Sequence, residues 1–231
     1  MWSVLPDNKH NTAPQNPSTY TSDLPTFTTD VRMLKTLDIF ATSPGRASPN
    51  HPEQYHGSGG GGPVEAVFWP KETGCQWRIR GAAYIVAPDV ANTRGDQPGE
   101  VSSGVRALKA EVGRHMRVRE GMDGTEGDWK WETELTGHFG NVSPGMRGTF
   151  RNPPPGQPTH GKEPEKGEEL GQKVQDLEDA KARENFRVVV IVPEEVERTD
   201  LSDPTKARRM FWTFEEVADG KGEWKAEELW P

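Results

Sequence analysis

The chain has 231 residues, with 36 acidic and 28 basic side chains and a formal net charge of −8. No basic stripe interleaved with aromatic residues is present, which argues against nucleic acid as a partner. The single cysteine, Cys75, cannot form an internal disulfide, the histidines lack ligand spacing, and neither a basic leader nor a membrane-long apolar run occurs. We therefore expect a soluble cytoplasmic protein with no membrane association and no metal site.

The first part of the chain predicts an extended segment followed by one domain. Residues 1–23 are assigned to the extended segment because residues 6–23 are rich in Pro, Asn, Thr and Ser, and residues 24–231 to a single domain. The domain is predicted to begin with a short strand over residues 26–29. A helix capped by Asp30 follows, with its buried side formed by Met33, Leu34, Leu37 and Phe40.

Two strands are predicted after a loop. Residues 43–63 are rich in Ser, Pro, His and Gly and predict a flexible loop. Residues 64–69 and 76–87 then read as an antiparallel hairpin. The side chains of the second strand alternate between two faces. The apolar face carries Trp77, Ile79, Ala83 and Ile85. The polar face carries Gln76, Arg78, Arg80 and Tyr84.

The remaining elements are predicted from apolar spacing. Two helices follow from Val105, Leu108, Val112 and Met116, and from Trp131, Leu135 and Phe139. Residues 152–168 predict a second flexible loop, residues 186–193 a strand buried on both faces, and residues 209–214 and 224–230 two closing strands. Short strands with a few helices and long loops indicate a mainly β fold, a barrel with peripheral helices.

The predicted turn from strand to helix is the first candidate site. Thr28 and Thr29 precede the helix, and Arg32 and Lys35 lie three residues apart on it. A helix N-terminus with two hydroxyl groups and two cations favours an anion such as a phosphate. The alternative is an ordinary capped helix with two solvated cations.

Two further segments are weaker candidates. The polar face of Gln76, Arg78 and Arg80 offers an amide and two guanidinium groups to a ring or an anion, although a cross-strand ladder of ion pairs is the alternative. Residues 139–148 predict a tight loop that brings Ser143 and Arg147 close to a ligand. A hydrolase that uses Ser143 or Cys75 lacks a base and an orienting carboxylate nearby in the sequence.

Taken in order, these segments resemble the FMN-binding branch of the pyridoxamine 5'-phosphate oxidase family. The resemblance runs from about Leu24 onward and rests on residues 27–35, 65–69, 76–81 and 143–156, and on the tail with Glu184-Asn185-Phe186, Leu201-Ser202-Asp203-Pro204, Ala207-Arg208-Arg209 and residues 224–231. It implies an FMN-binding split barrel that forms a homodimer with FMN at the subunit interface. Thr28, Thr29, Arg32 and Lys35 match the phosphate-binding segment, Gln76 the flavin-contacting glutamine, and Ser143 and Arg209 are weaker matches.

Two departures from the family pattern limit the expected activity. The helix and two strands that usually precede the Thr28 region are missing, so we expect an N-terminally truncated member. The family's Arg-x-His-x-Arg substrate pattern is replaced by Thr205-Lys206-Ala207-Arg208-Arg209, which keeps only the last arginine. We therefore expect FMN binding and a flavin-dependent oxidoreductase with an unknown small-molecule substrate; the alternative is a non-catalytic split-barrel interaction protein that has lost FMN binding.

Overall fold

The computed structural model describes residues 11–44, 56–91, 102–121, 129–161, 163–217 and 221–231. Within them a sheet has the strand order β3-β4-β6-β7-β8, with β2 as an additional partner of β6. A small sheet pairs β1 (Tyr20–Thr21) with β5 (Arg117–Val118). The strands of the main sheet are β2 (Thr26–Asp30), β3 (Gly59–Phe68), β4 (Cys75–Val86), β6 (Phe186–Asp200), β7 (Arg208–Val217) and β8 (Lys221–Leu229).

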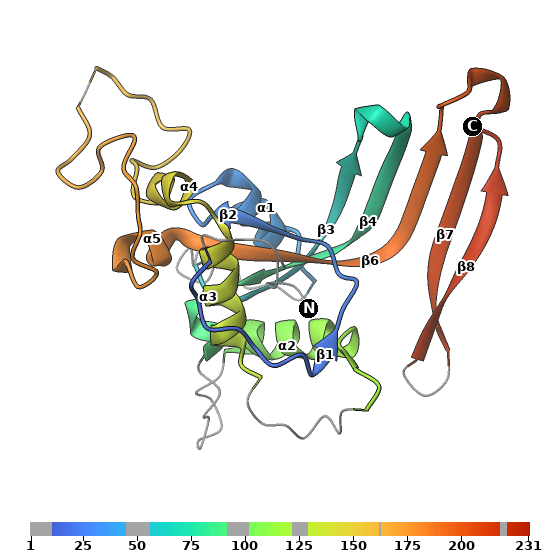
Figure 1. Cartoon of the computed structure of the whole chain (residues 1–231), viewed down its shortest axis with the longest axis horizontal. Coiled ribbons are helices and arrows are strands. Elements are labelled where there is room, and N and C mark those ends of the chain that lie inside the picture. Colours follow the sequence, from blue (N-terminus) through green and yellow to red (C-terminus); the bar gives the residue numbers. More distant parts are fainter. Residues whose placement is uncertain (1–10, 45–55, 92–101, 122–128, 162, 218–220) are drawn as a thin grey trace.

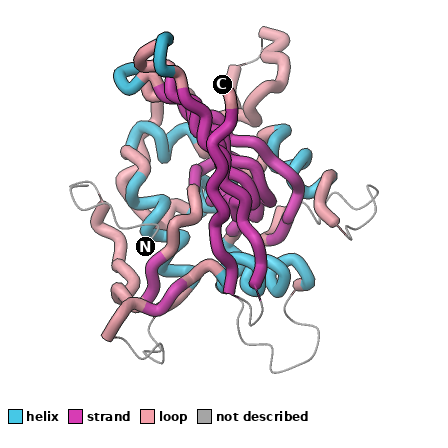
Figure 2. Tube along the Cα trace, turned by 90° about the vertical axis from the view of Figure 1, so that its right-hand side faces the viewer, coloured by secondary structure: helices cyan, strands magenta, loops and turns pink. Residues whose placement is uncertain are grey.

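The helices gather around one half of this sheet. They are α1 (Leu34–Ala41), α2 (Ser103–Arg114), α3 (Trp131–Asn141), α4 (Pro144–Thr149) and α5 (Ala180–Asn185). Figure 1 shows them around the first half of β6, whereas the far ends of β4, β6, β7 and β8 extend away from them; Figure 2 shows the strands running through the middle of the molecule. The mainly β class with peripheral helices is confirmed. In the described part of the chain, no helix is long and apolar enough to cross a membrane.

Strand β6 joins the two halves of the sheet. Its first residues pair with β2, its last residues pair with β7, and β4 runs beside it along nearly its whole length. The β4–β6 register shifts between Arg80 and Gly81. A Cβ atom at Gly81 would lie 2.0 Å from the carbonyl oxygen of Val192, so only glycine fits this irregularity. We call the part of β3, β4, β6, β7 and β8 that lies on the Cys75 side of Gly81 the wing.

The core lies on both faces of the helix-covered half. The face toward α2 and α3 packs Val86, Val188 and Val190 against Leu108 and Phe139. The opposite face packs a smaller cluster under α1, formed by Ile39, Phe40, Ala83, Ile85 and Val189. The run at 188–192 is therefore buried on both faces, as its continuous apolar pattern predicts.

The predicted hairpin is present, but β3 starts earlier than the loop prediction allows. Gly59, Gly60 and Gly61 have φ angles of 141°, 114° and 101°, and they form the beginning of the strand. A Cβ atom at Gly62 would lie 2.3 Å from the carbonyl oxygen of Ile39. Glycine here lets α1 pack closely on the strand, so residues 59–63 are not a loop; residues 45–55 of the predicted loop lie outside the described residues.

Helix α1 buries Phe40, as predicted, but not Leu34 and Leu37. Thr36, Ile39 and Phe40 are buried, whereas Leu34 is 75% exposed and Leu37 is 43% exposed. Asp30 does not cap the helix, because its Oδ1 atom accepts from the backbone N–H of Arg32 at 2.8 Å. The prediction was wrong because the start of the helix is set by the tight turn at Asp30 and the packing of Ile39 against β3 and β4.

The segment before β2 is extended and packs against α3. The amide of Asn11 donates to the carbonyl oxygen of Gly137 at 3.1 Å, and the amide of Asn16 donates to Glu134 Oε2 at 2.9 Å. Asn16 is 5% exposed. The polar composition of this segment does not predict the packing. Its asparagines pack against α3 through hydrogen bonds, whereas sequence patterns indicate burial only through apolar residues.

Candidate functional site

The turn from β2 to α1 forms one wall of a cavity of about 760 Å³. Thr28, Thr29 and Lys35 line it, whereas Arg32 does not. Thr28 and Lys35 are exposed, and Thr29 is 5% exposed. In the described part of the chain, no carboxylate lies within ion-pairing distance of Lys35, so its ammonium group is available to an anion in the cavity.

The backbone of Thr28 is also available. Val31 N–H donates to the carbonyl oxygen of Asn185 at 2.9 Å, and Ile191 N–H donates to that of Pro25 at 3.0 Å. Because hydrogen-bonded and non-hydrogen-bonded pairs alternate in an antiparallel ladder, the N–H of Thr28 points away from β6. Among the described strands β2 has no second neighbour, so this N–H faces an open edge. A hydroxyl, an N–H and an ammonium group together fit a phosphate.

Arg32 is committed to other partners. Its Nε and Nη2 atoms donate to the two carboxylate oxygens of Asp30 at 2.9 and 2.6 Å. Nη1 donates to the carbonyl oxygen of Asn152 at 2.9 Å and Nη2 also to that of Phe150 at 3.3 Å. The Asp30 carboxylate raises the pKa of Arg32 above its ordinary value. Arg32 therefore fixes the Asn152 wall of the cavity rather than lining it.

The other walls of the cavity come from α4 and from residues 152–170. They contribute an apolar surface of Met146, Leu170 and several prolines. Glu163, Glu165 and Glu168 also line the cavity, and Glu168 Oε1 accepts from Lys181 Nζ at 2.8 Å. The predicted loop at 152–168 contains no helix or strand in its described residues, and it lines the cavity together with Thr28, Thr29 and Lys35.

The segment at 139–148 is helical, so the prediction of a tight loop was wrong. It comprises the end of α3 and most of α4, and Ser143 caps α4, its Oγ accepting from the N–H of Met146 at 3.3 Å. Arg147 is 1% exposed, lies 5.7 Å from the centre of the Phe139 ring, and does not line the cavity. Burial lowers the pKa of its guanidinium group. Neither Ser143 nor Arg147 lines the cavity, whereas Val142 and Met146 do.

Gln76 and Arg209 lie together on the wing. Gln76 is opposite Thr199 on β6, and Thr199 is opposite Arg209 on β7, so the three side chains share one face. Arg78 Nε donates to Gln76 Oε1 at 2.9 Å, and Arg209 Nη2 donates to Glu197 Oε2 at 2.6 Å. We call these residues, Gln76, Arg78, Glu197, Thr199 and Arg209, the polar row.

The polar row continues into a ladder of ion pairs. Arg80 pairs with Glu65 at 2.6 Å and with Glu195 at 3.2 Å, and Arg78 pairs with Glu65 at 3.2 Å. The sequence alternative of a cross-strand ladder therefore applies to Arg78 and Arg80. The reverse face carries the apolar side chains predicted for it, with Trp77 stacked on Trp212 at 6.0 Å between ring centres.

The predicted cofactor residues thus form two separate groups in one chain. Thr28 pairs with Val188, and Gln76 pairs with Thr199, eleven residues further along β6. At roughly 3.3 Å per residue, the two levels are about 36 Å apart along the strand. The structure brings Thr28, Thr29 and Lys35 together, and separately Gln76 and Arg209, but does not unite the two groups.

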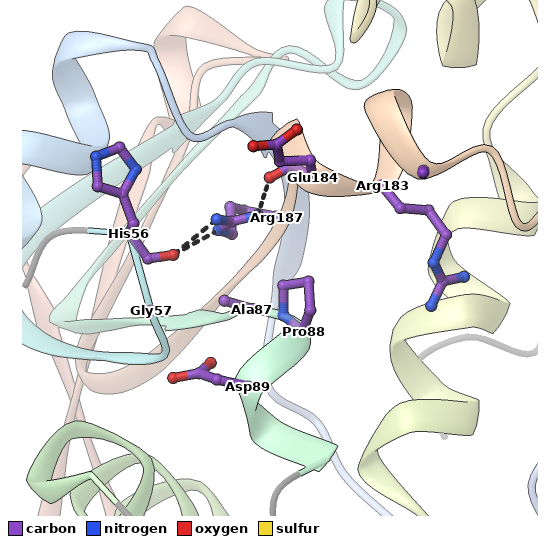
Figure 3. A pocket seen from close by; sticks show the side chains of 9 residues that line it. His56, Gly57, Ala87, Pro88, Asp89, Arg183, Glu184 and Arg187 are labelled. Atoms are coloured by element: carbon purple, nitrogen blue, oxygen red, sulfur yellow. Dashed lines mark hydrogen bonds between the residues drawn. The ribbon is translucent and has the colours of Figure 1, made fainter. Parts of the chain in front are cut away.

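A second cavity, of about 530 Å³, lies at the start of β6 (Figure 3). Arg187 lines it and is 5% exposed, but its Nη2 and Nε atoms donate to the carbonyl oxygen of His56 at 2.7 and 3.2 Å, and Nη1 donates to those of Glu184 and Phe186 at 2.8 Å. Burial lowers the pKa of Arg187 to about 10. The Asp89 carboxylate accepts from Ser58. This cavity contains none of the predicted site residues, and Asp89, Arg183 and Arg187 already bind other groups of the protein.

Sequence reasoning missed Glu197. It is 7% exposed and holds Arg209, but a single glutamate in a charged strand gives no signal of burial. Its place opposite Arg78 becomes visible only from the register of β4 on β6. In the described residues, no group of three or more His, Cys, Asp or Glu side chains is arranged to hold a metal ion.

Comparison with known proteins gives a family match for part of the chain. Residues 7–87 match the family model described as pyridoxamine 5'-phosphate oxidase, FMN-binding domain, a span that includes Thr28, Thr29, Lys35 and Gln76 but not Ser143 or Arg209. No curated protein matches the chain. A solved structure, that of a pyridoxamine 5'-phosphate oxidase-related, FMN binding protein from Nostoc punctiforme PCC 73102, is 15% identical, with a TM-score of 0.44; the match covers 91% of this chain and 74% of that one.

The family match agrees with the resemblance found in the sequence for residues 7–87, and it supports FMN as the cofactor of this part of the chain. The sheet confirms the mainly β class. The free hydroxyl and N–H of Thr28 and the free ammonium group of Lys35 fit the phosphate of FMN, because these donors face one cavity and bind no acidic group of the described chain.

Proposed function

We propose, from the membership of residues 7–87 in the pyridoxamine 5'-phosphate oxidase FMN-binding domain family, that this chain is a flavin-dependent oxidoreductase. The observation that carries the proposal is the cavity wall formed with Thr29 by Thr28 and Lys35, which offer unpaired donors to a phosphate. Bound FMN supplies transfer of hydride or of single electrons, and the protein supplies binding, orientation and electrostatics. The substrate is a small molecule whose identity the site does not reveal.

The cavity walls define what the chain contributes. Thr28 and Lys35 anchor the phosphate, and the prolines and Met146 form an apolar wall that keeps water from the ligand. The oxidation of pyridoxamine phosphate is not part of the proposal. Thr205 and Ala207 stand at the first arginine and the histidine of the family oxidase's substrate pattern. The neighbouring cations do not replace them, because Lys206 lies 4.0 Å from Asp203 with a side chain 82% exposed, and Arg208 pairs with Glu228.

We propose further that the working unit is a homodimer. The phosphate wall and the polar row lie about 36 Å apart along β6 at roughly 3.3 Å per residue, and one FMN cannot contact both within one chain. A second copy can bring its polar row to the phosphate wall of the first. The wing also exposes apolar area to solvent, including Phe68 at 48% and Trp224 at 43%, which favours burial against another subunit.

A second candidate is a non-catalytic split-barrel protein that has lost FMN binding. Two observations favour it: Arg32 is committed to Asp30, and three glutamates line the cavity that would receive an anion. Repulsion by the glutamates would weaken phosphate binding. Lys181 offsets the charge of Glu168, which leaves Glu163 and Glu165 as the opposing charges.

Size-exclusion chromatography of the chain incubated with excess FMN tests the proposal. We expect flavin absorbance to elute with protein at the mass of a dimer, and the bound flavin to bleach on addition of dithionite and recover in air. Flavin-free protein at the mass of a folded monomer or dimer would support the non-catalytic candidate instead. A flavoprotein that elutes as a monomer would retain the oxidoreductase proposal and contradict the homodimer.

A further inference from the structure

Glu197 is the buried charge at the centre of the polar row. It is 7% exposed, on β6 between Arg78 of β4 and Phe211 of β7. A buried carboxylate is stable only with a charged or hydrogen-bonding partner. Arg209 Nη2 supplies the ion pair at 2.6 Å, and Thr199 Oγ1 donates to the other carboxylate oxygen at 3.4 Å.

These contacts decide which hydrogen-bonding groups the row leaves for a ligand. Arg78 occupies the carbonyl oxygen Oε1 of Gln76, so the amide N–H groups of Gln76 remain to donate. The Nε–H of Arg209 is buried and has no acceptor among the described residues. The row therefore presents donors, and it suits the acceptor edge of a ring, its carbonyl oxygens and unprotonated nitrogens.

The charge of the row is set by the same contacts. A guanidinium group beside a flavin stabilises the two-electron-reduced ring, which carries more negative charge than the oxidised ring. Glu197 faces Arg209 directly and cancels part of that positive charge. The charge of Arg78 is neutralised separately by Glu65. The Glu197–Arg209 pair therefore determines the net charge of the polar row around Arg209.

We infer that Glu197 is a positioning residue that orients Arg209 toward the flavin ring and lowers the reduction potential of bound FMN. The inference rests on the proposed function, since it requires FMN to meet the polar row. Glu197 itself does not touch the ligand. Its effect is transmitted through the guanidinium group of Arg209.

The test is the reduction potential of the FMN-loaded full chain, measured by equilibration with a reference dye. Glu197→Gln keeps the size and a hydrogen bond but removes the charge, and we expect the ratio of reduced to oxidised flavin at a fixed potential to rise about tenfold, about 30 mV for a two-electron couple. Glu197→Asp retains the charge and should restore the original value. Glu195→Gln is the matched control: it lies on the same face, its partner is Arg80, and it should leave the potential unchanged.

An unchanged potential in Glu197→Gln with FMN bound overturns the inference and leaves the proposed function intact, whereas a wild-type chain that takes up no FMN overturns both. If Glu197→Gln does not fold, as judged by circular dichroism, Arg209→Gln decides the question. Loss of the cation should lower the potential in that variant. A potential equal to that of the wild type would overturn the inference.

Discussion

Arg32 and Asp30, two residues apart, form a two-pronged ion pair, with Nε to Oδ1 at 2.9 Å and Nη2 to Oδ2 at 2.6 Å. The same guanidinium group holds the carbonyl oxygens of Phe150 and Asn152, so it ties the β2–α1 turn to the end of α4. Arg32 thus fixes the shape of the cavity, whereas Lys35 lines the cavity and is the proposed contact to the ligand.

Substitution of Arg32 should therefore affect stability first. We expect Arg32→Ala to lower the free energy of unfolding by about 1–3 kcal/mol, because four partly buried hydrogen bonds are lost, one pair of them to a carboxylate. Urea unfolding followed by tryptophan fluorescence measures this. Lys35→Ala is the control, since Lys35 is exposed and forms no ion pair in the described chain; equal losses in the two variants would contradict this division of roles.

Asn16 should stabilise the contact between the N-terminal segment and α3. Its amide donates to Glu134 Oε2 and to the carbonyl oxygen of Lys130, and its Oδ1 accepts from the N–H of Lys130. Glu134 is 3% exposed, so loss of these bonds in Asn16→Ala should cost about 1–3 kcal/mol. Thr12→Ala, at an exposed neighbouring position, should cost less than about 0.5 kcal/mol. Similar midpoints for both variants in urea would disprove the contact.

Gly62 should resist substitution. A Cβ atom there would lie 2.3 Å from the carbonyl oxygen of Ile39 and 2.4 Å from Thr42 Oγ1, so Gly62→Ala must push α1 away from β3. We expect a loss of about 1–3 kcal/mol, as for other overpacked sites. Gly113→Ala in α2 meets no atom within 4 Å and should instead gain about 0.5–1 kcal/mol. Thermal unfolding of both variants checks the opposite signs.

The stability of the chain should depend on pH through His138. This side chain is buried on α3, and burial lowers its pKa below the ordinary value of 6.5, although Glu134, 3.8 Å away, opposes the shift. Since the folded-state pKa is lower than the unfolded one, the unfolded state binds more protons below about pH 6.5. Stability should therefore fall as the pH is lowered from 6.5 toward the folded-state pKa.

The measurement is the free energy of unfolding at pH 7.5 and at pH 5.5, in the wild type and in His138→Gln. The variant lacks the titrating group, so we expect a smaller loss of stability between the two pH values than in the wild type. Other groups titrate in both proteins and cancel in the comparison. An identical loss in both proteins would show that His138 does not contribute.

The sequence was informative wherever one local pattern decided the structure. The alternation in residues 76–87 placed Trp77 and Ile79 on one face and Gln76 and Arg78 on the other, as observed. Helical spacing located α2 and α3, and the continuous run at 188–192 identified the buried strand. In these cases burial follows from the period of the apolar residues alone.

It failed where packing between distant segments decided the structure. The glycine run before Pro63 reads as a linker, yet it forms strand because α1 packs against it. Phe40 is buried as predicted, but Leu34 and Leu37, which read as core residues, are exposed because Ile39 faces the sheet beside Phe40. The same holds for the site residues. The exposed donors of Thr28 and Lys35 could be predicted from the local turn, whereas the ion pair of Glu197 with Arg209 depends on strand register and could not.

The most direct test of FMN binding at this site compares FMN with riboflavin, which has the same ring but no phosphate. Fluorescence titration of both ligands should show that the wild type prefers FMN, and that Lys35→Ala reduces this preference about tenfold, the loss of one charge-assisted hydrogen bond. Binding of riboflavin should change little in the variant. Equal affinity for the two flavins in the wild type, or a preference for FMN that Lys35→Ala leaves intact, would contradict a phosphate site at Thr28 and Lys35.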